Sequence, residues 1–288
     1  MSSMKHANTN YNFKSLPLYS NPEIAIFCDF DETYRPVSSI HQNHSGINKL
    51  ENFLIEKSGG IPFIIGWISG SNLNSLLNKS RNYLSLLPNF ISPNLGTELF
   101  WNNDGKLKPD LEWDELIKAS GYQKSQTTRL AKEIRREGIE LEQQDNDYQG
   151  KNKACFYYYG YSKNEHSIKI IKSMAKKKGM KAMITKCNPA AGDPENAFDV
   201  DFIPNCCGKK EIVAFIQHKF TIPRSKSFAF GDSCNDIDML HAVSNAYLVG
   251  NADLKAQQLF PSVTKASYCH GILEILKKSS VVTTKKEA

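Results

Sequence analysis

Short apolar runs alternate with amphipathic helical patterns over residues 21–100 of the chain. Residues 24–28 and 61–68 are continuous apolar runs, which predict strands buried on both faces, and a third strand is expected at 90–91. Apolar residues recur at helical spacing over 46–57 and again from 73 to 77. This alternation of strands and helices predicts a parallel α/β sheet.

The pattern changes after residue 100 and resumes at residue 208. The stretch between is more charged, and its expected elements are helices at 127–137 and 165–178 and strands at 154–159, 181–187 and 197–203. The earlier rhythm then returns as a helix at 209–219, a strand at 227–230, a helix at 237–243 and a strand at 246–249. The sequence therefore predicts an α/β fold, in which a doubly wound parallel-sheet core of Rossmann-like type is built from both ends of the chain and carries an inserted α/β cap. The expected division is a mobile leader at 1–20, core at 21–100, cap at 101–204 and core again at 205–288.

Composition and charge narrow the class of partner. With 288 residues, 40% hydrophobic and 23% charged, the chain has the composition of a globular protein and is long enough for two domains. Its formal net charge of +6 suits phosphate-bearing small molecules as well as nucleic acid. The most basic run, Lys176–Lys178, is expected at a helix end, where cations are favourable, so we expect no nucleic-acid partner.

The chain shows no long apolar stretch, and its seven cysteines lack CxxC spacing. These features predict a cytoplasmic protein with reduced thiols and no membrane contact. A monomer and a homodimer both stay open.

Acidic residues follow the first expected strand directly. Asp29, Asp31 and Glu32 come immediately after the apolar run that ends at Cys28. The carboxyl ends of parallel strands are where loops converge and ligands bind, and two carboxylates this close repel each other unless a cation lies between them. A metal site is the functional interpretation, and a solvated loop after a strand is the alternative.

Three further stretches fall at strand ends or helix starts of the expected core: Ser69-Gly70, Gly208-Lys209 and the run from Gly231-Asp232 to Asp236. Taken singly, each has a structural explanation as a cap, a solvated lysine or a turn. In this order and in these contexts, together with Asp29 to Thr33, they resemble the four motifs of the haloacid dehalogenase superfamily of phosphotransferases. The resemblance covers the whole expected core.

The resemblance implies a magnesium-dependent phosphotransferase. Asp29 would attack phosphorus and Asp31 would act as acid and base. The implied Mg²⁺ ligands are Asp29, the backbone carbonyl of Asp31 and Asp232. The implied phosphate-binding residues are Ser69, Gly70, Lys209 and Asn235, and Asp236 would orient Asp232 and the waters of the metal.

The insertion between the second and third motifs resembles the large α/β cap of the sugar-phosphatase branch, which includes sucrose-phosphate phosphatases. Within that branch the chain most resembles kanosamine-6-phosphate phosphatases of amino-sugar antibiotic biosynthesis, notably at Leu95-Gly96-Thr97-Glu98, residues 187–189 and residues 191–195. Over about residues 106–149 the resemblance says little. The resemblance implies a small-molecule substrate, a hexose 6-phosphate, and kanosamine 6-phosphate most of all.

The last expected cap strand, 197–203, alternates acidic and apolar positions. Asp199 and Asp201 fall on one face and apolar residues on the other, and Asp193 lies in the preceding loop. One interpretation is that these acids bind the ammonium group of an amino sugar, since an anionic phosphate gives no reason for acids on a lid. The alternative is solvation of a turn and of a sheet face.

Two other functions compete with hydrolysis. A phosphomannomutase-like phosphotransferase would pass its phosphate to a second sugar hydroxyl, and a non-enzymatic phosphate- or metal-binding module would need the acidic pocket alone. Such a module has no need of Asp31 as an acid beside Asp29. Release of inorganic phosphate from a hexose 6-phosphate would separate the three.

Overall fold

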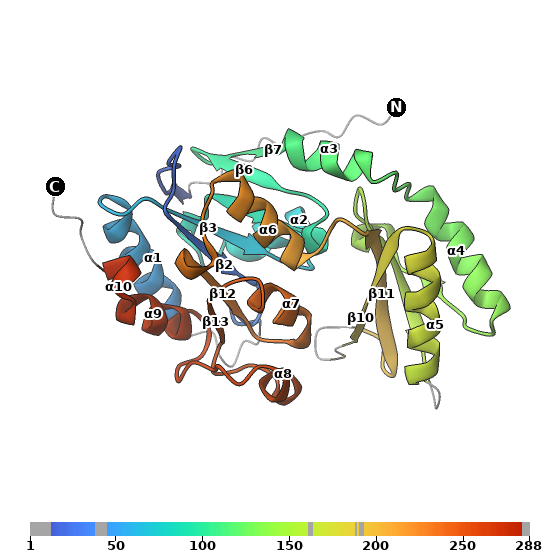
Figure 1. Ribbon diagram of the computed structural model, residues 1–288. Coiled ribbons are helices and arrows are strands. Elements are labelled where there is room, and N and C mark those ends of the chain that lie inside the picture. The colour runs from blue at the N-terminus through green and yellow to red at the C-terminus, as the bar shows by residue number, and fades with distance from the viewer. Residues whose placement is uncertain (1–12, 38–44, 161–163, 188, 190–192, 284–288) are drawn as a thin grey trace.

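The computed structural model describes residues 13–37, 45–160, 164–187, 189 and 193–283, and it contains two α/β units (Figure 1). The larger unit is built on a seven-stranded sheet of order β13-β12-β2-β3-β5-β6-β7. The first five strands in that order run parallel, and the last two form an antiparallel hairpin. Their bounds are β13 Asn245–Leu248, β12 Ser227–Gly231, β2 Ile24–Cys28, β3 Phe63–Ile68, β5 Phe90–Ser92, β6 Phe100–Asn103 and β7 Lys106–Pro109.

Each central strand sends alternate side chains into two separate apolar layers. In β2, Ile24 and Ile26 belong to one layer, whereas Ala25 and Phe27 belong to the other. The first layer is closed by α1 (Ser45–Ser58), α2 (Leu73–Ser80) and α9 (Tyr268–Lys278), and the second by α3 (Leu111–Ala119), α6 (Lys209–Lys219), α7 (Ile237–Leu240) and α8 (Leu254–Leu259). A short α10 (Ser280–Thr283) follows α9. Burial on both faces explains why these strands are continuously apolar, and it confirms the doubly wound core.

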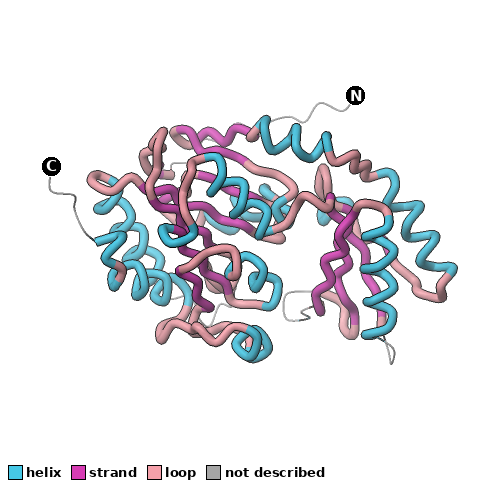
Figure 2. The backbone as a smooth tube through the Cα atoms, in the orientation of Figure 1, coloured by secondary structure: helices cyan, strands magenta, loops and turns pink. Residues whose placement is uncertain are grey.

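The smaller unit is a four-stranded antiparallel sheet with helices on one face (Figure 2). Its strands, in the order β10-β11-β9-β8, are β10 Met180–Lys186, β11 Ala197–Pro204, β9 Ala154–Tyr159 and β8 Glu142–Gln143. Helices α4 (Ser125–Arg136) and α5 (Asn164–Lys177) pack on Val200 and Phe202 of β11. In Figure 1 the sheet lies between these helices and the larger unit, so its open face is turned toward the core.

The expected alternation of β11 is confirmed. Val200 and Phe202 are buried under the helices, whereas Asp199 and Asp201 are half-buried on the opposite face. Asp199 pairs with Tyr157 of β9 and Thr185 of β10, which share its face.

Two boundaries differ from the expected ones. The expected cap start at 101 falls inside the β6–β7 hairpin, which extends the large sheet, and α3 packs in the core layer through Trp113 and Ile117. The turn of that hairpin, Asp104 and Gly105, has φ values of 50° and 79°, which suit a two-residue hairpin connection. The chain therefore stays with the core sheet through Pro109.

The second difference concerns the expected mobile leader, 1–20, because part of it is ordered against the core. Residues 1–12 lie outside the described residues, whereas β1 (Lys14–Ser15) pairs in parallel with β4 (Leu86–Leu87) and Leu16 is buried. Among the helices in the described ranges, none combines the length and the apolar composition that a bilayer crossing requires.

Candidate active site

The first and fourth motifs lie at the carboxyl ends of neighbouring strands. Asp29 follows β2 and Asp232 follows β12, and the backbone N–H of Asp29 donates to the carbonyl of Phe230 at 2.9 Å. Ser69 follows β3, which lies on the other side of β2. The chain passes from β2 to β3 on one side, and after the cap it returns to place β12 on the other side of β2. Such a switch point is where open α/β sheets bind ligands.

Three carboxylates gather there around one ammonium group. Asp29, Asp232 and Asp236 each offer an oxygen within 4.8 Å of the others. Lys209 Nζ lies 2.5 Å from Asp29 Oδ1 and 2.6 Å from Asp236 Oδ1, and its side chain is almost entirely buried. Acids therefore outnumber the cation in this cluster.

Local backbone structure places Asp236 and Lys209. The Oδ2 of Asp236 accepts hydrogen bonds from the N–H groups of Asp232, at 3.0 Å, and Ser233, at 3.1 Å. These bonds stabilise the turn that follows β12 and hold the Asp236 side chain in place. A Cβ on Gly231 would lie 2.4 Å from the Cβ of Asp236, so this turn requires glycine there. Lys209 is the first residue of α6, preceded by Gly208 at φ 144°.

Burial and mutual repulsion shift the pKa values of this cluster. Burial chiefly raises the pKa of Asp29 above its ordinary range, although Lys209 opposes the shift and Asp236 adds to it. Burial and the charges of Asp29 and Asp236 raise the pKa of Asp232 as well. Burial alone would lower the pKa of Lys209, but Asp236 and Asp29 raise it, so this lysine is a fixed positive charge.

The cluster fits a divalent cation. Carboxylate oxygens are the ligands that Mg²⁺ prefers, and a second positive centre would relieve the repulsion that raises both aspartate pKa values. Asp29 and Asp232 would hold the ion. The Oδ1 of Asp232 also accepts the hydroxyl of Thr33 at 2.8 Å, a contact between residues far apart in sequence that the sequence analysis did not predict.

The Asp31 carboxylate lies in a second polar group beside the acid cluster. Its Oδ2 accepts Lys79 Nζ at 2.6 Å and Ser71 Oγ at 3.1 Å, and its Oδ1 lies 3.5 Å from Arg35 Nη1. The metal contact expected of Asp31 concerned its backbone carbonyl, so the position of the side chain leaves that expectation open. Lys79 carried no sequence signal, because its role depends on how α2 packs beside the first motif. The contact of Arg35, four residues after Asp31, was also not predicted.

The expected phosphate-binding residues lie on the loops around this cluster. Ser69 is buried, and its Oγ accepts the N–H of Ser71 at 3.1 Å. The Oδ1 of Asn235 is buried and has no hydrogen-bond partner among the described residues. The carbonyl of Gly70 accepts Lys153 Nζ, which comes from the cap, at 3.3 Å.

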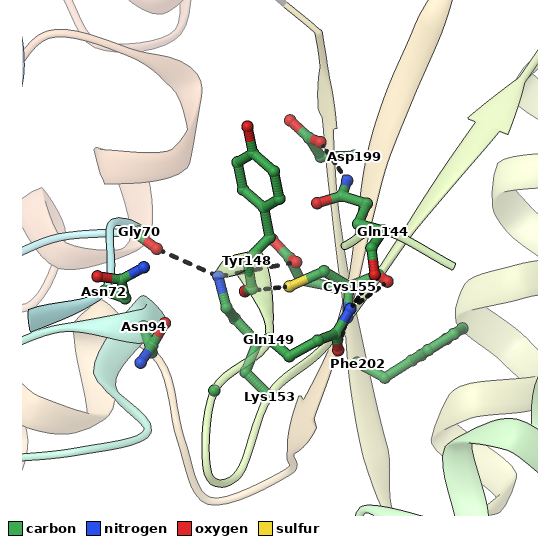
Figure 3. Close-up of polar contacts among 12 residues, drawn as sticks. Gly70, Asn72, Asn94, Gln144, Tyr148, Gln149, Lys153, Cys155, Asp199 and Phe202 are labelled. Carbon is green, nitrogen blue, oxygen red and sulfur yellow. Dashed lines mark hydrogen bonds and ion pairs between the residues drawn. The ribbon is translucent and has the colours of Figure 1, made fainter. Parts of the chain in front are cut away.

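The three cap acids have different partners. Asp199 Oδ1 accepts Gln144 Nε2 at 2.7 Å (Figure 3). The Asp199 carboxylate also lies in one group with Asp193 and Cys187. Burial above all raises the pKa of Asp199 to about 6. Asp201, by contrast, lies 4.0 Å from the ammonium of Lys153. Residues 188 and 190–192, which carry part of the family resemblance, lie outside the described residues.

Comparison with known proteins agrees with this geometry. Residues 22–278 match the family model of sucrose-6F-phosphate phosphohydrolases. The chain is 36% identical over 271 residues to a kanosamine-6-phosphate phosphatase of Bacillus subtilis, which covers 92% of this chain and 96% of that protein. The crystal structure of a haloacid dehalogenase-like hydrolase from Bacillus subtilis has a TM-score of 0.75 at 35% identity, and covers 93% of this chain and 96% of that one.

The fold also matches that of the sucrose-phosphatase of Synechocystis, solved with sucrose and phosphate. The TM-score is 0.70 at 17% identity, over 89% of this chain and 97% of that one. The matched region contains all four motifs, the acid cluster and the inserted sheet. The chain belongs to the sucrose-6F-phosphate phosphohydrolase family, within the haloacid dehalogenase-like phosphohydrolases that act on sugar phosphates.

Proposed function

We propose that this enzyme hydrolyses an amino-hexose 6-phosphate, kanosamine 6-phosphate first, to the free amino sugar and inorganic phosphate with the help of Mg²⁺. The observation that carries the phosphatase function is the buried cluster of Asp29, Asp232 and Asp236 around Lys209. The 36% identity to a kanosamine-6-phosphate phosphatase and the acids on the open face of the cap sheet support the choice of sugar.

The proposed reaction runs in two steps on Asp29. Its carboxylate attacks phosphorus, the bond from phosphorus to the sugar oxygen breaks, and Asp31 donates a proton to that oxygen. Asp31 then takes a proton from water, which attacks the aspartyl-phosphate and frees both Asp29 and inorganic phosphate. Bound Mg²⁺ would neutralise phosphate charge so that an anionic nucleophile can approach.

The other residues of the site position these two aspartates. Lys209 holds Asp29 through its Oδ1 and offers a positive charge to the phosphate beside it. Lys79 and Ser71 hold the Asp31 carboxylate on the side where the second motif begins. The other oxygen of that carboxylate, Oδ1, accepts no hydrogen bond among the described residues, so it can carry the proton that passes to the leaving oxygen.

We assign recognition of the sugar amine to Asp199, with Asp193 beside it. Asp201 already faces the ammonium of Lys153, whereas Asp199 accepts a hydrogen bond from a neutral group, the side-chain amide of Gln144. A substrate ammonium next to Asp199 would relieve the burial penalty that raises the pKa of this acid. An amino sugar therefore fits this face better than a neutral hexose does.

A phosphate-release screen tests the proposal. The enzyme is incubated with Mg²⁺ and with hexose 6-phosphates that either carry or lack an amine, and both inorganic phosphate and phosphorylated sugars are followed. We expect phosphate and free sugar as the products. Transfer of phosphate between sugar positions would instead indicate a mutase, and binding without turnover would indicate a non-enzymatic module.

A further inference from the structure

One buried cation of the cap contacts the phosphate-binding loop of the core. Lys153 comes just before β9 and is 6% exposed, and its ammonium lies 3.3 Å from the carbonyl of Gly70 and 4.0 Å from Asp201 Oδ1. Figure 3 shows this side chain reaching from the cap toward Gly70. Burying an ammonium group costs free energy unless the group is paired and hydrogen-bonded. A buried lysine that bridges the two units therefore suggests a function for the contact.

The contact leads directly to a side chain of the site. The carbonyl of Gly70 and the N–H of Ser71 belong to the same rigid peptide group. Lys153 holds one end of that group, and the other end donates to Ser69 Oγ at 3.1 Å. Turning this peptide would therefore turn the donor that orients the Ser69 hydroxyl.

The same loop reaches the proposed acid. The hydroxyl of Ser71 donates to Asp31 Oδ2 at 3.1 Å. A fixed Gly70–Ser71 peptide thus orients a phosphate-binding hydroxyl on one side and supports Asp31 on the other. Among the described residues of the four core motifs, Gly70 is the one that forms a hydrogen bond or an ion pair with Lys153. The other partner of Lys153, Asp201, belongs to the cap.

The cap segment that carries Lys153 is braced and docked. The side chain of Gln149 bonds the backbone of Gln144 and of Cys155, each at 3.0 Å, which stiffens the loop. Asn72 Nδ2 of the core donates to the carbonyl of Asp147 at 2.8 Å, and Asn152 Nδ2 donates to the carbonyl of Thr97 at 3.4 Å. The contacts of Asn72 and Asn152 join cap to core, as that of Lys153 does, so these three form and break together when the two units approach or separate.

We infer that Lys153 is a positioning residue through which cap closure orients the Ser69 hydroxyl for phosphate, by anchoring the Gly70–Ser71 peptide. Asp201 keeps this lysine in place, and burial, which would lower the pKa of Lys153, is outweighed by Asp201 and its neighbours, which raise it. The inference rests on the proposed phosphatase function but not on the identity of the sugar. It explains why an acid on the cap face is paired with a lysine that is aimed at the core.

A double-mutant cycle between Lys153→Met and Ser69→Ala tests the inference. The affinity for inorganic phosphate with Mg²⁺, measured by calorimetry, and kcat/KM for p-nitrophenyl phosphate and for the sugar phosphate are compared in the wild type, both single variants and the double variant. We expect each single change to weaken phosphate binding and both kcat/KM values by roughly three- to ten-fold. The double variant should lose no more than the Ser69→Ala variant does.

Matched variants separate this role from others. Lys151→Met removes the same charge from the same loop, but Lys151 pairs with Asp114 at 2.9 Å, so no loss is expected there. Lys153→Arg should restore part of the function. If Lys153→Met lowers the melting temperature, Lys153→Met with Asp201→Asn removes both buried charges and gives a stable background for the same measurements.

Three outcomes would overturn the inference: unchanged phosphate affinity in Lys153→Met, losses that add in the double variant, or a loss confined to the sugar substrate, which would make Lys153 a sugar contact. Failure of the wild type to act on amino-hexose phosphates would refute the proposed substrate alone. The phosphate-binding measurements would still decide the role of Lys153.

Discussion

Lys209 stands between two of the three clustered acids, and its charge determines how much negative charge is left for a metal ion. Its ammonium contacts Asp29 and Asp236, whereas Asp232 receives the hydroxyl of Thr33. Burial chiefly raises the pKa values of Asp29 and Asp232, and repulsion adds to the shift because three carboxylates and one ammonium leave a net negative site when all are ionised. One site can therefore hold a divalent cation and, next to Lys209, a phosphate.

Replacing Asp29 by Asn is expected to reduce turnover at least roughly a thousand-fold, because an amide does not attack phosphorus. The change is nearly isosteric, so the melting temperature should stay close to that of the wild type. Phosphate release and thermal unfolding, both with Mg²⁺, check these two expectations. Asp238→Asn, an exposed acid of α7, is the matched control. Turnover near the wild-type rate in a folded Asp29→Asn sample would show that another residue is the nucleophile.

Replacing Asp31 by Asn should discriminate between leaving groups. An alkyl oxygen needs a proton as it leaves, whereas an aryl oxygen hardly does, so the phosphorylation step should fall by about 10²- to 10⁴-fold for a sugar phosphate and much less for an aryl phosphate. Single-turnover kinetics isolate that step. Equal losses on both substrates would mean that Asp31 acts in some way other than protonating the leaving oxygen.

Metal binding should depend on pH in a defined direction. Burial raises the pKa of Asp29 to about 7 and that of Asp232 to about 9, against about 3.9 in an unfolded chain. Folded carboxyls that hold protons more tightly than unfolded ones lose folding stability as pH rises, so the metal-free protein should become less stable between about pH 4 and about pH 9. Mg²⁺ competes with these protons, and its stabilising effect should grow over the same range.

Thermal unfolding with a chelator and with Mg²⁺, at about pH 6 and about pH 8, measures this competition. We expect the increase in melting temperature on adding Mg²⁺ to be larger at the higher pH. An increase that is equal at both pH values, or larger at the lower one, would show that Mg²⁺ does not displace protons from these aspartates.

At the scale of elements, the sequence was informative where one pattern repeats within one segment. The continuous apolar runs of β2 and β3 predicted buried parallel strands because both faces of each strand meet apolar layers. The hairpin of β6 and β7 escaped prediction. Its Asp104-Gly105 turn was visible, but membership of the core sheet depends on how Trp101 packs on Phe90 and on Phe220, the second of which lies far from it in the sequence.

The residues of the candidate site also fall into those that the sequence predicted and those that it did not. Asp29, Asp232 and Lys209 could be found because each lies at the end of a strand or the start of a helix with a recognisable motif. Lys79 and Lys153 could not, since one reaches Asp31 from the last turn of α2 and the other reaches Gly70 from another domain. The sequence pattern around a long, flexible side chain does not indicate which distant residue that side chain contacts.

The turn after β12 can be tested as an element. Gly231→Ala would bring a Cβ within 2.4 Å of the Cβ of Asp236, which has to move and give up its contacts with Lys209 and with the Asp232 N–H. We expect a loss of about 1–3 kcal/mol in the free energy of unfolding and a marked fall in kcat. Chemical denaturation and phosphate release measure both. Gly60→Ala, where an added Cβ meets nothing, is the control, and two variants that behave alike would refute this role of the turn.

At the scale of the whole molecule, we propose that the core carries out the chemistry and that the cap selects the sugar. The core carries the acid cluster, and the cap turns an acidic sheet face toward it (Figure 1). Because β6, β7 and α3 belong with the core, we propose that the cap runs from about residue 120 to residue 204. Its two connections to the core would then follow α3 and precede α6.

We propose above all that this phosphatase selects a hexose 6-phosphate that carries an amine, and that Asp199 binds this amine. A hydrogen bond between charged groups contributes roughly 1.5–3 kcal/mol, which corresponds to about ten- to a hundred-fold in selectivity. The direct measurement is the ratio of kcat/KM for kanosamine 6-phosphate to that for glucose 6-phosphate, in the wild type and in Asp193→Asn, Asp199→Asn and Asp201→Asn.

We predict a wild-type ratio of at least about ten. Asp199→Asn should bring it close to one, and Asp193→Asn should lower it in part. Asp201→Asn should weaken both sugars alike and keep the ratio, because Asp201 is paired with Lys153. Equal kcat/KM values for the two sugars on the wild-type enzyme would contradict the account.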